Sequence, residues 1–121
     1  MYLVDTNVLS ELLRIAADPA VLRWVAAQAP GRLYTTAITR AEMLHDARLL
    51  PPGKRQQRLE ASVAAMFDED FASRVLPFDS AAADAYTRIA AARKQAGQPI
   101  SQFDAQIAAI ALANSGELAT R

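Results

Sequence analysis

The stretch that most constrains the fold lies at the start of the chain, in Tyr2-Leu3-Val4-Asp5-Thr6-Asn7. Three apolar residues lead directly into an acid, and helical spacing begins at Val8. A short run that is wholly apolar is typical of a strand buried on both faces, as in a parallel sheet. Asp5 then stands at the carboxyl end of that strand, where open α/β sheets bind ligands. Because Thr6 or Asn7 already suits the N-cap of the next helix, we interpret Asp5 as a functional residue rather than as a cap.

The length and composition narrow the classes of protein. A chain of 121 residues suits one domain, and we expect a single domain over residues 1–121. The formal net charge is zero, so contact with nucleic acid must come from a local patch or from bound metal ions. The absence of cysteine excludes disulfides and thiolate metal sites. Asp5 interrupts any signal-peptide core, and no apolar run reaches membrane-spanning length, so we expect a cytoplasmic protein without membrane contact.

Predicted strands alternate with predicted helices along the chain. The strands are expected at the first residues and over residues 32–35, 74–78 and 117–120. The helices are expected from Val8 to near Ala17, from Pro19 to the break at Pro30-Gly31, and over residues 37–49, 54–67, 80–96 and 102–114. This alternation predicts an α/β fold with a parallel sheet built from right-handed crossovers.

A second candidate acid, Glu42, lies near the start of the predicted helix 37–49. Thr39-x-x-Glu42 also fits a capping box, in which Glu42 would only close the helix end. A capping box that began at Thr39 would start the helix after Ala37 and Ile38, although both residues fit the helical pattern. We therefore favour a functional role for Glu42.

A third candidate acid, Asp104, is the third residue of a helix that Ser101 is expected to cap. Ser101-x-x-Asp104 again resembles a capping box. The same helix face continues through Ala108 and Ala111, so we expect Asp104 to face the close-packed side rather than water. On that geometry we favour function here too.

Other conspicuous residues favour structural roles. Trp24 is expected to pack in a buried or partly buried position rather than to stack on a base. His45 is the only histidine and makes neither a triad nor a metal cluster, so we expect a surface or packing role. The basic run Lys54–Arg58 could touch phosphates. We favour a solvated helix face for it, because Asp68-Glu69-Asp70 offsets its charge. Asp79 is interpreted as a helix cap.

The three candidate acids are expected to meet at the carboxyl edge of the sheet, although they lie far apart in the sequence. Asp5 ends a strand, and Glu42 and Asp104 each lie near the start of a helix. Three acids without basic neighbours repel one another and resist ionising together. A divalent cation removes that conflict, and oxygen-only ligands select Mg²⁺ or Mn²⁺. Such an ion can activate water and neutralise a phosphate under in-line attack.

Four segments occur in an order that resembles a known family. They are Leu-Val-Asp-Thr-Asn-Val-Leu-Ser-Glu, Thr-Ala-Ile-Thr-Arg-Ala-Glu, Pro-Ile-Ser-Gln-Phe-Asp-Ala-Gln-Ile-Ala-Ala-Ile-Ala, and the final Leu-Ala-Thr-Arg. The chain resembles a PIN-domain ribonuclease of the VapC type, the toxin half of a VapBC toxin–antitoxin pair, and is most similar to the FitB-like subgroup. The resemblance covers essentially the whole chain.

The resemblance implies a three-layer α/β/α fold with a short, mainly parallel central sheet. It implies Mg²⁺- or Mn²⁺-dependent RNA cleavage, with Asp5, Glu42 and Asp104 as metal-binding and catalytic acids. Thr6 and Asn7 match polar residues beside the first acid, which would orient a ligand or water. It also implies a homodimer and inhibition by a VapB-type antitoxin. One departure concerns the end: members usually carry another acid just beyond the Ala-Thr-Arg segment, followed by a final strand. We therefore expect an incomplete ligand set and weak activity.

Two other functions remain open at this point. The three acids could instead belong to a catalytically impaired module that binds RNA or only the antitoxin. A Mg²⁺-dependent phosphohydrolase of small molecules is the other alternative. A phosphoaspartyl phosphatase requires a second acid soon after its nucleophile, and Thr6-Asn7-Val8 provides none. The helices around Trp24 and the segment from Leu44 to Leu59 carry surplus apolar surface. This predicts a homodimer, or a groove for an antitoxin helix or extended peptide.

Overall fold

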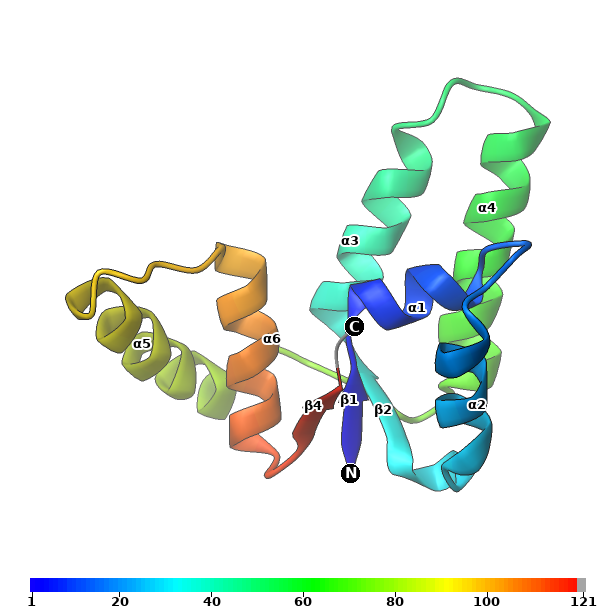
Figure 1. Cartoon of the computed structure of the whole chain (residues 1–121). Coiled ribbons are helices and arrows are strands. Elements are labelled where there is room, and N and C mark those ends of the chain that lie inside the picture. The colour runs from blue at the N-terminus through cyan, green and yellow to red at the C-terminus, as the bar shows by residue number, and fades with distance from the viewer. Residues whose placement is uncertain (120–121) are drawn as a thin grey trace.

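The computed structural model describes residues 1–119, in which helices cover both faces of a four-stranded sheet (Figure 1). The elements in chain order are β1 (Tyr2–Val4), α1 (Thr6–Leu12), α2 (Pro19–Ala27), the 3-10 turn η1 (Pro30–Arg32), β2 (Leu33–Thr36), α3 (Ala37–Arg48), α4 (Lys54–Ala65), the π-helical turn η2 (Met66–Asp70), β3 (Val75–Leu76), α5 (Ser80–Gln95), α6 (Gln102–Ala113) and β4 (Glu117–Ala119).

The sheet has the order β3-β2-β1-β4, and every neighbouring pair is parallel. In the register, Leu3 lies beside Tyr34 of β2 on one side and beside Leu118 of β4 on the other. The first strand is therefore an inner strand, as its wholly apolar run predicts. The expected parallel sheet and the three-layer α/β/α fold are both confirmed.

The two faces of β1 build two separate cores, because successive side chains of a strand point to opposite faces. Leu3 packs with Ala82 of α5 and with Ile110 and Ala111 of α6. Val4 points the other way, into a larger core beneath α1 to α4, where Phe67 is its largest fully buried member. Figure 1 shows the corresponding separation, with α5 and α6 on one side of the sheet and α1 to α4 on the other. The carboxyl edge of the sheet lies between these two groups of helices (Figure 1).

Helix starts follow the predicted caps in most places. Asp18, Asp79 and Ser101 each accept a hydrogen bond from a backbone N–H in the first turn of the helix that follows. The alternative of a capping box from Thr39 is excluded, as we expected, because Thr36 caps α3 and accepts from the Thr39 N–H at 3.0 Å. As a result α3 begins at Ala37, as its helical pattern predicts.

Several boundaries differ from the expected ones. Helix α1 ends at Leu12 rather than near Ala17. Strand β3 has only two residues, since Pro77 follows it and offers no N–H to a ladder. Strand β4 is described as far as Ala119, and the expected strand residue Thr120 lies outside the described residues.

The structural roles of two single residues are confirmed. Trp24 is partly buried and meets the Tyr2 ring edge-on, with ring centroids 5.5 Å apart. His45 lies on the surface. Among residues 1–119, no helix is both long enough and apolar enough to span a membrane.

Gly116 makes the passage from α6 into β4 possible. A Cβ atom placed on it would lie 2.7 Å from the Leu3 side chain, which is too close for any real contact. The missing side chain therefore lets the chain turn tightly against the inner strand and align β4 with β1.

Candidate catalytic site at the carboxyl edge of the sheet

The topology brings the three candidate acids to one edge of the sheet. Asp5 directly follows β1, and Glu42 lies in the second turn of α3, which continues from β2. Asp104 lies in the first turn of α6, which runs back along the sheet to enter β4 at the opposite edge (Figure 1). Because β1, β2 and β4 are parallel, these positions share the carboxyl edge where α/β sheets place ligands.

Asp5 caps α1, contrary to our expectation. Its Oδ1 accepts a hydrogen bond from the Val8 N–H at 3.1 Å. Thr6 and Asn7 cannot take this role, because the helix already begins at Thr6. The cap uses one oxygen of a half-buried carboxylate, which has about four acceptor positions in all. Capping and ligand binding are therefore compatible in this side chain.

Glu42 is held by Thr6, at the start of the neighbouring helix α1. The Thr6 hydroxyl donates to Glu42 Oε1 at 3.0 Å, which ties the start of α1 to α3. Glu42 is half-buried, and no arginine or lysine pairs with it among residues 1–119. Thr6, the residue next to Asp5, therefore positions Glu42.

The pKa of Glu42 is affected by its burial and by the other acids nearby. Burial raises the pKa of Glu42 above its ordinary value of 4.5, and the hydrogen bond from Thr6 partly opposes this. The negative charges of Asp104, Asp46 and Asp5 raise the pKa further, in that order. Asp46 was missed by the sequence argument, although it lies four residues after Glu42 and so on the same helix face. Together these groups form a negative rim, defined here as Asp5, Glu42, Asp46 and Asp104.

Asp104 faces solvent, so the expectation that it faces the close-packed side is wrong. The buried residues of α6 include Ala105 and Ala109 instead. Each follows by one position a residue that we expected on the buried face, Asp104 and Ala108. Ser101 caps the helix as predicted, accepting from the Asp104 N–H at 3.1 Å. This leaves the Asp104 carboxylate exposed at the rim, where a ligand in solution can reach it.

Two neighbours on α1 complete the surroundings. Asn7 is exposed and lines a hollow of about 290 Å³ together with Ser10, Glu11 and Arg14. Glu11 is only 5% exposed; it accepts from the Asp18 N–H at 2.7 Å and from Arg14 at 3.3 Å. Its burial was not foreseen, and only the arginine three residues later hints at it. These contacts make Glu11 a structural acid.

The donor set suits a hydrated hard cation. Among residues 1–119, no three His, Cys, Asp or Glu side chains converge closely enough to form a ready-made metal cage. Mg²⁺ is usually held through one or two carboxylates and keeps several waters, so it does not require such a cage. Asp5, Glu42 and Asp104 offer oxygen ligands only, and within the described chain none has a basic partner. The residues therefore fit Mg²⁺ or Mn²⁺ bound partly through water.

Comparison with known proteins gives the family. The PIN domain family matches residues 2–121. The chain belongs to the PIN-domain family, among its VapC-type and FitB-like members. It is 44% identical to the plasmid stability protein StbB of Pseudomonas syringae pv. tomato, over all of this chain and 87% of that protein. It is 42% identical to the VapC ribonuclease Y4jK of Sinorhizobium fredii, over all of this chain and 86% of that protein.

Solved structures agree with this PIN-domain assignment. The FitAcB crystal structure from Neisseria gonorrhoeae superposes with a TM-score of 0.92 at 37% identity. It is matched over all of this chain and 87% of that chain. The resemblance to VapC-type, FitB-like PIN domains is thereby confirmed.

Proposed function

We propose that this PIN domain is a metal-dependent endoribonuclease and the toxin of a VapBC-type toxin–antitoxin pair. The observation that carries the proposal is the negative rim at the carboxyl edge of the sheet, whose acids lack basic partners among residues 1–119. Similarity over the whole of this chain to a protein named VapC ribonuclease and to one named Toxin FitB supports it.

The roles of the site residues follow from their positions. Asp5, Glu42 and Asp104 would hold Mg²⁺ or Mn²⁺. When bound, such an ion supplies an activated water and neutralises charge on the phosphate. Thr6 fixes one oxygen of Glu42 through its hydroxyl. Asn7 is exposed beside Asp5, where its amide can orient the RNA backbone or a water.

An antitoxin partner is part of this proposal. A solved FitAB complex bound to a DNA fragment contains a chain that superposes on this one with a TM-score of 0.91 at 38% identity. The described chain has a largely apolar pocket of about 520 Å³ beside Trp24, Tyr2 and Leu118, near the helices expected to bind a partner. We place a VapB-type antitoxin segment there. The homodimer and the cytoplasmic location stay predictions.

RNA cleavage with and without metal tests the function. Single-stranded RNA should be cut in the presence of Mg²⁺ and left intact in EDTA, and Asp104→Asn should remove the activity. RNA binding without cleavage would instead favour the catalytically impaired module. Hydrolysis of small phosphate esters but not of RNA would favour the phosphohydrolase.

A further inference from the structure

The strongest concentration of positive charge lies far from the core, at the tip of the α3–α4 hairpin. Residues 48–58 contain four cationic side chains and no acid, in a chain whose formal net charge is zero. Arg48 pairs with Glu60 at 3.5 Å. The other three are exposed and have no ion pair among residues 1–119; they are Lys54, Arg55 and Arg58, here called the basic tip.

The acids expected to offset the basic tip do not do so. Asp68 pairs with Arg40 at 2.8 Å, and the other two acids of that run lie in η2, at the opposite end of α4. The predicted solvated helix face is confirmed, since all three cations are exposed, but the expectation that these acids offset its charge is wrong. The charge of the tip is available to a ligand.

The basic tip also works against the stability of its own helix. Lys54 and Arg55 occupy the first turn of α4, which has no acid and no side-chain cap. Cations at this positive end of the helix dipole are unfavourable. Arg58 lies four residues after Lys54 and three after Arg55, and like charges at these spacings repel. Helix α5 shows the favourable arrangement, with Arg93 and Lys94 in its last turn. A local arrangement that costs stability without a structural gain points to function.

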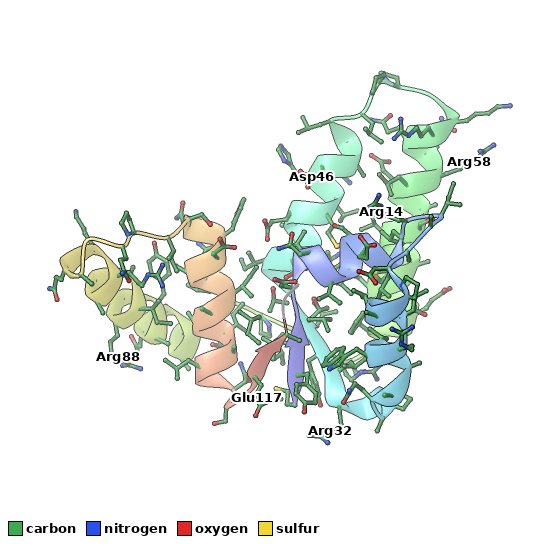
Figure 2. All side chains as sticks on the ribbon, in the orientation of Figure 1. Arg14, Arg32, Asp46, Arg58, Arg88 and Glu117 are labelled. Carbon is green, nitrogen blue, oxygen red and sulfur yellow. The ribbon has the colours of Figure 1, made fainter. Side chains whose placement is uncertain are left out.

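The position of the tip relates it to the negative rim. Gln56, within the basic run, donates a hydrogen bond to the Arg48 carbonyl at 2.9 Å, so the tip lies beside the end of α3. Arg48 follows Glu42 by six residues on α3, or roughly 9 Å along its axis. Figure 1 shows α3 and α4 extending together beyond the carboxyl edge, and Figure 2 shows Arg58 projecting outward from α4. When one phosphate of a negatively charged polymer is held at the rim, a nearby phosphate of the same polymer can reach the tip.

We infer that the basic tip binds the phosphate backbone of single-stranded RNA beside the segment that is cut. This inference rests on the proposed nuclease function and adds the surface that holds the substrate. The negative rim repels RNA unless a metal is bound, so the tip supplies attraction that does not depend on the metal. Because the tip contacts phosphates, it holds RNA of any sequence and positions it without selecting the base.

The test compares two triple variants in the full chain. The tip variant is Lys54→Gln, Arg55→Gln and Arg58→Gln. The matched control removes three exposed arginines on other elements: Arg23→Gln, Arg32→Gln and Arg88→Gln. Figure 2 shows Arg32 at the amino end of the sheet and Arg88 on α5, both away from the hairpin. Each variant loses the same charge, so bulk electrostatics change equally.

Binding of a fluorescein-labelled oligouridylate is measured across a salt series, in EDTA and on an Asp104→Asn background. Each lost phosphate contact to a single strand lowers the slope of log affinity against log salt by about 0.7, so the tip variant should lose about 2. The control should keep the parent slope. In the active protein with Mg²⁺, the tip variant should raise KM and leave kcat unchanged. Its Tm should rise by roughly 2–5 °C, because the unfavourable charges are gone.

Equal salt slopes for parent and tip variant, or equal losses in both triple variants, would overturn the inference. A tip variant that binds RNA like its parent but no longer binds polyglutamate would assign the tip to an acidic peptide partner instead. Failure of the proposed function gives a different pattern, namely no RNA cleavage by the parent with Mg²⁺. The salt slopes in EDTA report on the tip in either case.

Discussion

The acids at the carboxyl edge of the sheet differ in their partners from three acids that lie elsewhere in the molecule. Glu11, Glu60 and Asp68 each have an arginine within 4 Å. The four acids of the negative rim have no such partner among residues 1–119, and three of them raise the pKa of the fourth, Glu42. An arginine offsets the charge of each of the first three acids, whereas the mutual repulsion of the rim acids costs stability.

The largest expected effect is on activity at the rim. Asp5→Asn and Asp104→Asn should each lower RNA cleavage by about 100-fold or more, because a neutral amide is a poor ligand for a hard cation. Asparagine caps helices as well as aspartate does, so Asp5→Asn should leave thermal unfolding nearly unchanged. Asp5→Ala is the informative control, since it should lose activity and also about 1 kcal/mol of stability. Full activity in either asparagine variant would remove that acid from the site.

The opposite pattern is expected at Glu11, which stands for the paired acids. Glu11→Ala should lower the free energy of unfolding by about 2–3 kcal/mol, because it leaves the Asp18 N–H without this acceptor. Arg14→Gln should cost less than about 1 kcal/mol, since the arginine side chain is 67% exposed. Urea denaturation measures both. RNA cleavage per folded molecule should not change; a large loss of cleavage would break the division between the two classes of acid.

A smaller, pH-dependent effect should identify Glu42 as an acid that destabilises the folded protein when it is ionised. Its pKa is raised in the folded state, so folding favours the protonated form, and stability falls as pH rises from 4.5 through the folded-state pKa. Glu42→Gln keeps an oxygen for the Thr6 hydroxyl and has no charge. Its Tm should exceed that of the parent at pH 7, and the difference should shrink as pH falls toward 4.5 and below.

Metal addition sharpens the same measurement. A cation that binds the folded state raises Tm by mass action. Mg²⁺ should therefore stabilise the parent at pH 7 and have much less effect on Glu42→Gln. A variant that is less stable than the parent at pH 7 would contradict the account of Glu42.

The smallest effect is expected for a surface pair. Arg40 and Asp68 are 2.8 Å apart, but the Asp68 side chain is 61% exposed. Asp68→Asn should change the free energy of unfolding by no more than about 0.5 kcal/mol. It should leave cleavage unchanged as well. Differential scanning calorimetry and an RNA cleavage assay, run side by side, check both expectations.

Much of the fold could be predicted from sequence, because strong local signals mark it. Pro30-Gly31 and Gly53 interrupt the helical pattern, and the apolar run before Asp5 marks an inner strand. The parallel order then follows from crossover rules. The early end of α1 was missed because residues that favour a helix continue past Leu12, and β3 is shorter than expected because Pro77 follows it and offers no N–H to the ladder.

The candidate site was predictable in its acids but not in their contacts. The strand-to-helix positions of Asp5 and Glu42 identify the edge, whereas the cap made by Asp5 depends on where α1 begins. The exposure of Asp104 was missed because alanines surround α6 on several faces, so periodicity does not say which face is buried. The Thr6–Glu42 hydrogen bond joins segments 36 residues apart, and no local pattern encodes it.

The central place of β1 governs when the protein can become active during its synthesis. The first strand to be made is sandwiched between β2 and β4, and β4 holds some of the last described residues. At a translation rate of about 5–20 residues per second, one side of β1 waits several seconds for its partner. Asp104 likewise reaches Asp5 only after α6 has been made. A nascent chain that is stopped before α6 carries three of the four rim acids and three of the four strands, so the rim and the sheet both stay incomplete until α6 and β4 have been made.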